Sequence, residues 1–492
     1  MVNTKEIRVL ILTIYVIQIW GQAAQGPAET IPPNEVKLSL GPNLFIDDYL
    51  IADSNGLKRT THQPQKDPNP IFHVPPGQVL YDCNSSRYRM WYTESHPVSN
   101  LAYALAESKD GIEWYKPELG LVEAGGTKKN NYLDAPAGCF QGQFLDEGPD
   151  FADAARRYKM AYFRRGMCVA FSPDGMRFTD FKGNPVISES ASNIPYYEPG
   201  YKNVISDVIV GCWDPLKKEY LVICKIEESG YPGKPHHHAE GYRRVVGMTT
   251  SKDFIVWEKP EVIIRPDPKN GLEEFYAFAP MVRGNVYIGF LHVLRDDLAA
   301  TQGGPVEGIG WTELVTSRDG RNWTRYQEKF LDRDLREGRF DHAMAWCGDS
   351  IFVGDKEYIY YAALLSGHKT DRVHGRKSGL AVLRRNGFVS RDAGPEGGLL
   401  KTPIVKLAGE RMTVNANARY EMRVRLVDAN GQVMQGFDWT DCMPVRGDSV
   451  SHRVTWKGDP KLPQKKSARI EFFISNTELY GFDFYEDCLR QE

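Results

Sequence analysis

Ser108–Trp114 reads SKDGIEW, and this seven-residue phrase decides the fold because it recurs along the chain. It returns as SPDGMRF at 172–178, as SKDFIVW at 251–257 and as SRDGRNW at 317–323, with a degenerate fifth copy, RNGF, at 385–388. Successive copies lie about 65 to 80 residues apart, and self-similarity of this kind is typical of propellers and solenoids. An Asp in this position can close an Asx-type turn, and the Gly after it supplies a positive φ. The phrase therefore predicts a repeated structural turn with no direct catalytic role.

Predicted strands accompany each copy of the phrase. One strand is rich in aromatic residues, as in Tyr88–Thr93 (YRMWYT) and Tyr358–Ala362 (YIYYA). The next, such as Leu101–Leu105, runs into the turn. Four-stranded sheets arranged radially bury both faces and leave only short edges. We therefore expect an all-β chain with a five-bladed β-propeller over residues 41–398, in which Leu44–Ile51 is a candidate closing strand.

The remaining C-terminal residues, 399–492, are long enough for a separate small domain. Apolar and charged residues alternate in Tyr420–Val427 and Ala468–Ile474, as in a sheet with one buried face. This pattern predicts a small β-sandwich. Such a domain could bind carbohydrate or buttress the propeller, and buttressing is favoured.

The N-terminus has the pattern of an export signal. Lys5 and Arg8 precede the apolar run Val9–Trp20, which is too short to span a membrane, and small residues follow it. We expect a signal peptide at 1–24, a flexible leader at 25–40, and a periplasmic or extracellular protein without a membrane span.

Charge and cysteine content narrow the functional classes. The formal net charge of −3 does not indicate the basic surface that proteins use to bind nucleic acid. The eight cysteines lack a CxxC pair or a spacing suited to zinc, although Cys442 and Cys488 could form a bridge in the last domain. No cofactor is expected to be required, a structural calcium ion is left open, and the oligomeric state is not predicted.

Carboxylates at the starts of the innermost strands are the main candidates for chemistry. Asp207, Glu274 and Asp341 occupy such positions, so all three are expected at one end of the central channel. Cleavage of a glycosidic bond needs one protonated carboxyl group as acid and one ionised carboxylate as base or nucleophile. For any one of them alone, a strand-end cap or an ion pair is the simpler interpretation. Three aspartates at the far strand ends are expected to serve hairpin turns instead: Asp82, Asp146 and Asp214.

Several histidines, arginines and one loop tyrosine are candidates for substrate binding. A histidine can hydrogen-bond a sugar hydroxyl, an arginine can hold the carboxylate or sulfate of an acidic sugar, and a loop aromatic ring can stack on a sugar. Each also has a structural interpretation, as a satisfied turn histidine or as a counter-charge to a glutamate. These candidates are His292, His342, His368, Arg243, Arg283 and Tyr197. The tract Pro235–His238 is interpreted as an exposed loop rather than a metal site.

The repeats, the FIDD sequence at Phe45–Asp48 and the C-terminal strands resemble exported bacterial proteins related to glycoside hydrolase families 32 and 43. The resemblance covers the chain from about residue 40 to 487. It implies a five-bladed propeller whose inner strands supply carboxylates as base or nucleophile, as transition-state stabiliser and as acid. On this basis Asp207 matches the stabilising residue and Glu274 the acid.

The resemblance does not extend to the motif of the first blade. The fructosidase signature WMNDPNG is absent, and the nearest string is KDPNP at Lys66–Pro70. The first inner strand offers no carboxylate at its start, so the role of base or nucleophile is assigned to Asp47 or Asp48, with Asp67 as another possibility.

The sequence thus predicts an exported glycoside hydrolase acting on plant or algal oligo- or polysaccharides. A propeller that binds carbohydrate without cleaving it is one alternative, and a polysaccharide lyase using Tyr and His on an acidic sugar is another. The catalytic candidates are Asp47, Asp48, Asp207, Glu274 and Asp341.

Overall fold

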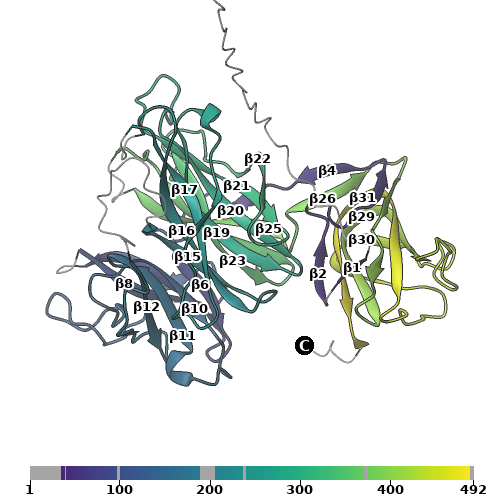
Figure 1. Ribbon diagram of the computed structural model, residues 1–492, viewed down its shortest axis with the longest axis horizontal. Coiled ribbons are helices and arrows are strands. Elements are labelled where there is room, and N and C mark those ends of the chain that lie inside the picture. The colour runs from purple at the N-terminus through teal and green to yellow at the C-terminus, as the bar shows by residue number, and fades with distance from the viewer. Residues whose placement is uncertain are drawn as a thin grey trace, which may run out of the picture.

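The computed structural model describes residues 35–38, 40–96, 100–188, 205–235, 240–370 and 375–487. Their regular structure is nearly all β, with only the short 3-10 helices η1 (Ala154–Arg156) and η2 (Pro268–Asn270). Figure 1 shows two β-rich bodies side by side. The all-β prediction is confirmed, and the predicted signal peptide lies outside the described residues.

Strand pairing divides the larger body into three separate antiparallel sheets and one eight-stranded sheet, whose two halves are joined by a single parallel bridge between Gly310 and Met344. With the two halves described separately, the body has five units. The first contains β6 (Gln78–Asp82), β7 (Arg87–His96), β8 (Asn100–Ser108) and β9 (Trp114–Tyr115). The second contains β10 (Phe140–Asp146), β11 (Tyr158–Phe163), β12 (Gly166–Ser172) and β13 (Thr179–Asp180), with β14 (Ile187–Ser188) also paired to β12. The third contains β15 (Ile205–Asp214), β16 (Glu219–Ser229), β17 (Tyr242–Ser251) and β18 (Glu261–Ile264). The fourth contains β19 (Glu273–Arg283), β20 (Val286–Arg295), β21 (Ile309–Ser317) and β22 (Trp323–Leu331).

The fifth unit is completed from the other end of the chain. It contains β23 (Met344–Val353), β24 (Lys356–Leu364), β25 (Arg376–Arg384) and the N-terminal β5 (Gln65–Lys66), which pairs with β25. The innermost strands β6, β10, β15, β19 and β23 contact one another in cyclic order, which closes the ring of a propeller. Closure therefore joins residues that are more than three hundred positions apart.

The predicted closing strand Leu44–Ile51 is wrong. Its first residue ends β2 (Gly41–Leu44), and β2 pairs with β31 (Ser467–Tyr485) in the smaller body. Phe45 and Leu50 are fully buried in the core of that body. This apolar burial holds the segment there and leaves β5 to close the propeller.

The recurring phrase forms the predicted turn. The Ser108 hydroxyl accepts the Gly111 N–H at 2.9 Å, and the Asp110 carboxylate accepts the N–H groups of Ile112 and Glu113 at 2.9 Å. The same contacts recur at Ser172, Ser251 and Ser317. In the third copy Phe254 takes the glycine position with a φ of 67°, and its completely buried ring compensates for that conformation.

The smaller body is one ten-stranded sheet around a single hydrophobic core. Its N-terminal strands are β1 (Val36–Lys37), β2, β3 (Asp53–Asn55) and β4 (Lys58–Thr61). Its C-terminal strands are β26 (Val389–Ala393), β27 (Gly398–Lys401), β28 (Val405–Lys406), β29 (Arg411–Asp428), β30 (Val445–Val454) and β31. In Figure 1 the purple β2 and β4 lie in the same body as β29 to β31.

The predicted domain boundaries therefore need correction. Strands β1 to β4 and β26 belong to the C-terminal sheet and not to a leader or to the propeller. The reason is the length of β31, whose two halves pair with different strands, including β2, β26 and β27. Each of the seven described cysteines, Cys442 among them, is a free thiol, and Cys488 lies outside the described residues.

Candidate functional site

Bulges in the inner strands shape the central channel. The pairing register with the neighbouring strand shifts at four places: between Phe140 and Gln143, between Ile205 and Ile209, between Phe275 and Ala277, and between Cys347 and Ser350. A bulge leaves residues out of the ladder and re-aims their side chains, often beside an active site. The residues in these four shifts include Asp207, Tyr276 and Asp349.

A hollow of about 250 Å³ lies at the ring of inner strands. All five inner strands line it, and each contributes one of the residues Gln78, Gln143, Ile209, Tyr276 and Asp349. The hollow is therefore the channel interior, where the sequence analysis placed the chemistry.

Aromatic faces form much of the wall. The Tyr276 ring stacks on Trp346 with centroids 4.8 Å apart, and the His292 ring stacks on Trp346 at 5.6 Å. Trp91, which also lines the hollow, is almost completely buried. Such faces provide apolar contact area for a ligand, while a few polar groups fix its orientation.

Asp349 brings a carboxyl group into this apolar setting. Its Oδ2 accepts the Val79 N–H at 2.8 Å. Burial raises the pKa of Asp349 to about 7, although the Val79 N–H and the Gln78 side chain act in the opposite direction. A carboxyl group with a pKa in this range is suited to donating a proton near neutral pH.

Two amide groups complete the polar lining. The Gln78 Oε1 and Gln143 Nε2 atoms are buried and have no hydrogen-bond partner among the described residues. A buried polar atom without a partner costs about 1–3 kcal/mol. Both atoms are closed to solvent, so a ligand in the hollow bonds them only after the lining shifts. One is an acceptor and the other is a donor, which matches the dual character of a hydroxyl group.

The structure brings Asp207 and Glu274 together around Tyr276. The Lys225 ammonium group and the Arg244 guanidinium group each lie 5.4 Å from the Tyr276 ring centroid. Lys225 pairs with Asp207, and Arg244 pairs with Glu274 at 2.6 Å. Both carboxylates lie at the starts of their strands, as predicted.

These two carboxylates differ in their exposure to solvent. The Glu274 side chain is completely buried, and its other oxygen accepts the Arg244 N–H at 3.0 Å. Its carboxylate is thus turned toward Arg244. The Asp207 side chain is 35% exposed and precedes Val208, which lines the hollow. Of the pair, Asp207 is the more exposed, although it is not among the residues that line the hollow.

Asp341 contacts the closing strand. Its carboxylate pairs with Lys66 of β5 at 2.7 Å and accepts the Tyr361 hydroxyl at 3.2 Å. His342, its neighbour, lies 3.1 Å from the Thr301 hydroxyl and 3.0 Å from the Asp334 carbonyl. Both residues are buried, and their described contacts tie the fifth unit to β5 and to nearby loops.

Asp47 and Asp48 lie away from the channel mouth. Asp47 pairs with Arg318 at 2.6 Å, and Arg318 also donates to Asn285 in the turn after β19. Because β19 begins at the mouth, that turn is on the opposite face. Asp48 pairs with Arg391 of β26 at 2.7 Å. The structure therefore does not bring the residues predicted as base or nucleophile to the channel.

The predicted binding histidines flank the aromatic wall. His292 lines the hollow, its Nε2 lies 2.6 Å from the Cys347 carbonyl, and burial lowers its pKa to about 4, so the ring is neutral near pH 7. His368 is buried 3.2 Å from Asp296 and meets the Tyr276 ring edge-on at 5.4 Å.

The predicted binding arginines have structural contacts. Arg243 is buried and donates to the carbonyl groups of Tyr242 at 2.7 Å and Gly271 at 3.1 Å. Arg283, at the far end of β19, pairs with Glu357 at 3.1 Å. Tyr197 and the histidines of the 235–238 tract lie outside the described residues.

The predicted turn aspartates are confirmed in that role. Asp82 accepts the Asn84 N–H, Asp146 the Gly148 N–H and Asp214 the Leu216 N–H. In contrast, Asp349, Gln78 and Gln143 were not identified from the sequence. For Asp349 the only local signal was the preceding Gly348, and a Gly-Asp pair is equally typical of a turn.

The described residues contain neither a metal-binding cluster nor a membrane-spanning helix. No group of three or more His, Cys, Asp or Glu side chains in this part of the chain is arranged to hold a metal ion. No helix in the same residues has the length and hydropathy needed to cross a bilayer.

Comparison with known proteins gives structural matches only. No family model matches the chain, and no curated relative does. A glycoside hydrolase structure aligns at 13% identity over 69% of this chain and 93% of its own, with a TM-score of 0.43. A family 32 β-fructofuranosidase from Bombyx mori aligns at 12% identity over 86% and 96%, with a TM-score of 0.40.

A family 43 arabinoxylan arabinofuranohydrolase from Bacillus subtilis aligns at 11% identity over 85% of this chain and 97% of its own, with a TM-score of 0.41. Both families named from the sequence are thus among the matches. At these identities and TM-scores the matches carry no argument about substrate or catalytic residues, which must come from the channel itself.

Proposed function

We propose that this protein is a glycoside hydrolase that binds the end of an oligo- or polysaccharide in the central channel. The observation that carries the proposal is the Asp349 carboxyl group, whose pKa of about 7 places a proton donor among aromatic faces. A general acid works best when its pKa lies near the working pH. Gln78 and Gln143 supply hydrogen bonds for sugar hydroxyls beside it.

In this proposal Asp349 protonates the leaving glycosidic oxygen. Asp207, at the mouth, is the second carboxylate, which either attacks the anomeric carbon or activates a water molecule. The bulge in β15 aims Asp207, and its pairing with Lys225 fixes its position. Tyr276 and Trp346, which stack on each other, supply the apolar wall that the sugar contacts.

The same proposal includes export of the protein and a class of substrate. The charged residues followed by the apolar run Val9–Trp20 support export. An exported enzyme would meet polymeric glycans of plant or algal origin, which are the proposed substrates.

A second candidate is a carbohydrate-binding propeller without turnover. One observation favours it: among the described residues lining the hollow, Asp349 is the only carboxylate. Hydrolysis needs two. If Asp207 does not reach the bound sugar, the channel binds glycans without cleaving them.

A product screen tests both candidates. The purified protein is incubated with a panel of plant and algal oligosaccharides, and products are identified by mass spectrometry beside Asp349→Asn and the control Asp448→Asn, which replaces an exposed carboxylate. We expect a released sugar whose rate falls at least about 100-fold in Asp349→Asn and not in the control. Release that Asp349→Asn preserves would refute its role as acid, whereas binding without release would establish the second candidate.

A further inference from the structure

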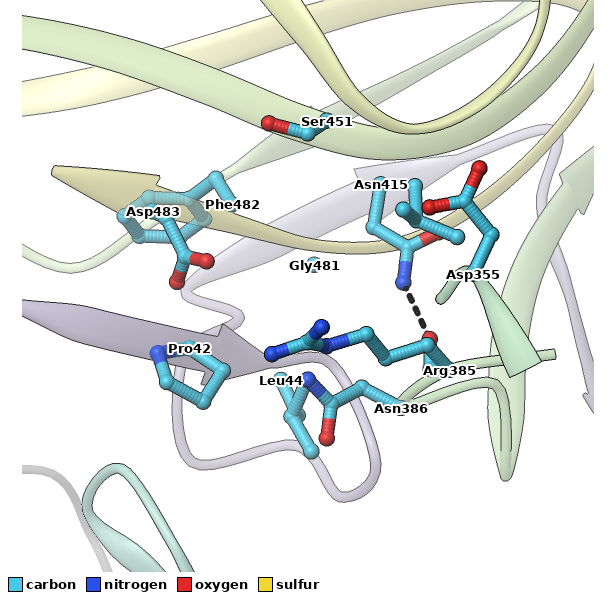
Figure 2. A pocket seen from close by; sticks show the side chains of 11 residues that line it. Pro42, Leu44, Asp355, Arg385, Asn386, Asn415, Ser451, Gly481, Phe482 and Asp483 are labelled. Atoms are coloured by element: carbon cyan, nitrogen blue, oxygen red, sulfur yellow. Dashed lines mark hydrogen bonds between the residues drawn. The ribbon is translucent and has the colours of Figure 1, made fainter. Parts of the chain in front are cut away.

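Two hollows in the described part of the chain differ in what they leave open to a ligand. In the hollow between the fifth propeller unit and the C-terminal sheet, the Asn415 amide donates to the Arg385 carbonyl at 2.8 Å, as the dashed line in Figure 2 shows. Two unsatisfied oxygens there, Asn386 Oδ1 and Asp483 Oδ1, are closed to solvent and out of a ligand's reach. In the channel hollow, by contrast, His292 has a ring nitrogen that a ligand can reach.

The Cys347 carbonyl determines which ring nitrogen of His292 carries the proton. A carbonyl oxygen only accepts hydrogen bonds, and this one lies 2.6 Å from Nε2, so Nε2 is the donor. Burial lowers the pKa of His292 to about 4, so the ring carries a single proton near pH 7. Nδ1 is therefore a bare nitrogen, which accepts a hydrogen bond and cannot donate one.

The bulge in β23 holds the ring in this state. The Cys347 N–H donates to the Thr312 hydroxyl at 2.9 Å, and that hydroxyl donates to the Ala345 carbonyl at 3.0 Å, so the position of Cys347 is fixed. The His292 ring also stacks on Trp346 with an angle of 6° between the ring planes. Tautomer and ring orientation are thus set before a ligand enters, which lowers the cost of binding.

Nδ1 is open to the channel hollow. His292 lines the hollow and is partly exposed. Its Nδ1 has no hydrogen-bond partner among the described residues and, unlike the unsatisfied atoms of Gln78 and Gln143, is not closed to solvent. Two neighbours in the lining do not compete for it, because Ala277 has no polar side chain and the Trp346 N–H donates to a main-chain carbonyl at 3.2 Å.

A fixed acceptor selects the group that it faces. A hydroxyl group can donate to it, whereas a carboxylate, a sulfate or an ether oxygen has only lone pairs to present. We propose that His292 Nδ1 accepts a hydrogen bond from one hydroxyl group of the sugar in the channel and makes that hydroxyl a requirement for tight binding. This inference rests on the proposed function for the presence of a sugar, but it does not require that the sugar is cleaved.

The tautomer and the contact are measured by 15N NMR on the full protein labelled at histidine. D-xylose, L-arabinose, D-glucose and D-galactose are added in turn, and the signals missing from His292→Phe identify the ring. We expect one protonated and one bare nitrogen at pH 7, and a shift of the bare-nitrogen signal with a sugar that calorimetry shows to bind. A proton on Nδ1, or a signal that such a sugar does not move, would overturn the inference.

The requirement for one hydroxyl is tested with sugar analogues and matched variants. Calorimetry gives the affinities of the sugar that binds and of its monodeoxy analogues for the wild type, His292→Phe and the control His62→Phe. His62 also packs on an aromatic ring, Tyr480 at 5.1 Å, and its Nε2 lies 2.7 Å from the Ser390 hydroxyl, outside the hollow. The phenylalanine ring keeps the aromatic packing in both variants and removes the nitrogens.

We expect one monodeoxy analogue to bind the wild type about tenfold more weakly than the parent sugar, which corresponds to about 1.4 kcal/mol. His292→Phe should bind the parent and that analogue equally weakly, and His62→Phe should match the wild type. A variant that only shifted the bulge would weaken all analogues and keep the discrimination, and this result would overturn the inference.

The wild-type measurements stand even if His292→Phe does not fold, because every monodeoxy analogue binding as tightly as the parent would overturn the inference without the variant. Binding with the expected discrimination but without cleavage would refute hydrolysis and support the role of His292. Cleavage without any discrimination would do the reverse. If none of the sugars binds and no glycan is cleaved, both proposals are wrong.

Discussion

Burial of the Asp349 carboxyl group makes the stability of the whole protein depend on pH. In the unfolded chain an Asp has a pKa of about 3.9, whereas burial raises the pKa of Asp349 to about 7. The folded state thus holds this proton more tightly. Its stabilising contribution is complete below pH ~4 and is lost as the pH rises through about 7.

Asp349→Asn should therefore become more stable relative to the wild type as the pH rises. The variant keeps an uncharged group at all pH values, while the wild type must bury a charge above pH ~7. Melting temperatures of both proteins at pH 5 and pH 8 test this, with the variant gaining several degrees at the higher pH. A constant difference between the two melting temperatures would show that Asp349 does not titrate near neutrality.

Replacing Gln143 distinguishes a role in ligand binding from a role in stability. Its buried Nε2 has no partner among the described residues, so Gln143→Leu removes an unsatisfied donor rather than a bond. We expect stability to be unchanged or slightly higher, and affinity for a channel-bound oligosaccharide to fall about tenfold. Urea unfolding and calorimetry measure the two effects. A large loss of stability with unchanged affinity would mean that Gln143 is structural.

At the scale of elements, two residues of β5 close the propeller, and Lys66 anchors them through Asp341. The Asp341 side chain is 2% exposed, so Lys66→Met leaves a buried charge without its cation. We expect a loss of about 3 kcal/mol in the free energy of unfolding. Lys329→Met is the matched control, because Lys329 pairs with Asp332 on an exposed surface and should cost less than ~1 kcal/mol. Equal effects in urea unfolding would contradict this role for β5.

The elements also show what the sequence could reveal. The repeated turns were predictable because the side chains of Ser108 and Asp110 accept backbone N–H groups within the same seven residues. The closing strand was not, because Gln65–Lys66 finds its partner more than three hundred residues away. Two residues have too little pattern to indicate a strand.

The candidate site was predicted in place but not in composition. Asp207 was expected at the channel mouth because it begins an inner strand, and Asp82 was expected in a turn at the far end of its strand. Both residues lie where they were expected. Asp349 was missed because Gly348–Asp349 reads as a turn, and a bulge depends on the pairing of two strands rather than on local residues. Asp47 was misplaced because a family resemblance carries no information on which core buries Phe45.

At the scale of the whole molecule, the two bodies are built from interleaved segments. Strands β1 to β4 and β26 lie in the C-terminal sheet, so a cut after Gly398 removes β29 to β31 and exposes Phe45 and Leu50. We expect a chain ending at residue 398 to be insoluble or aggregated, as judged by gel filtration. A monomeric, cooperatively folded truncated chain would contradict this dependence.

The channel carries the central claim, because its carboxyl group is the proposed source of catalysis.

The most direct test of the central claim is the pH dependence of kcat/KM for the wild type on an oligosaccharide found in the product screen. With Asp349 as the acid, kcat/KM should fall about tenfold per pH unit above pH ~7, and Asp349→Asn should lack this descending limb and be at least about 100-fold slower at pH 6. A profile that is flat through pH 7, or one that Asp349→Asn shares with the wild type, would contradict the account.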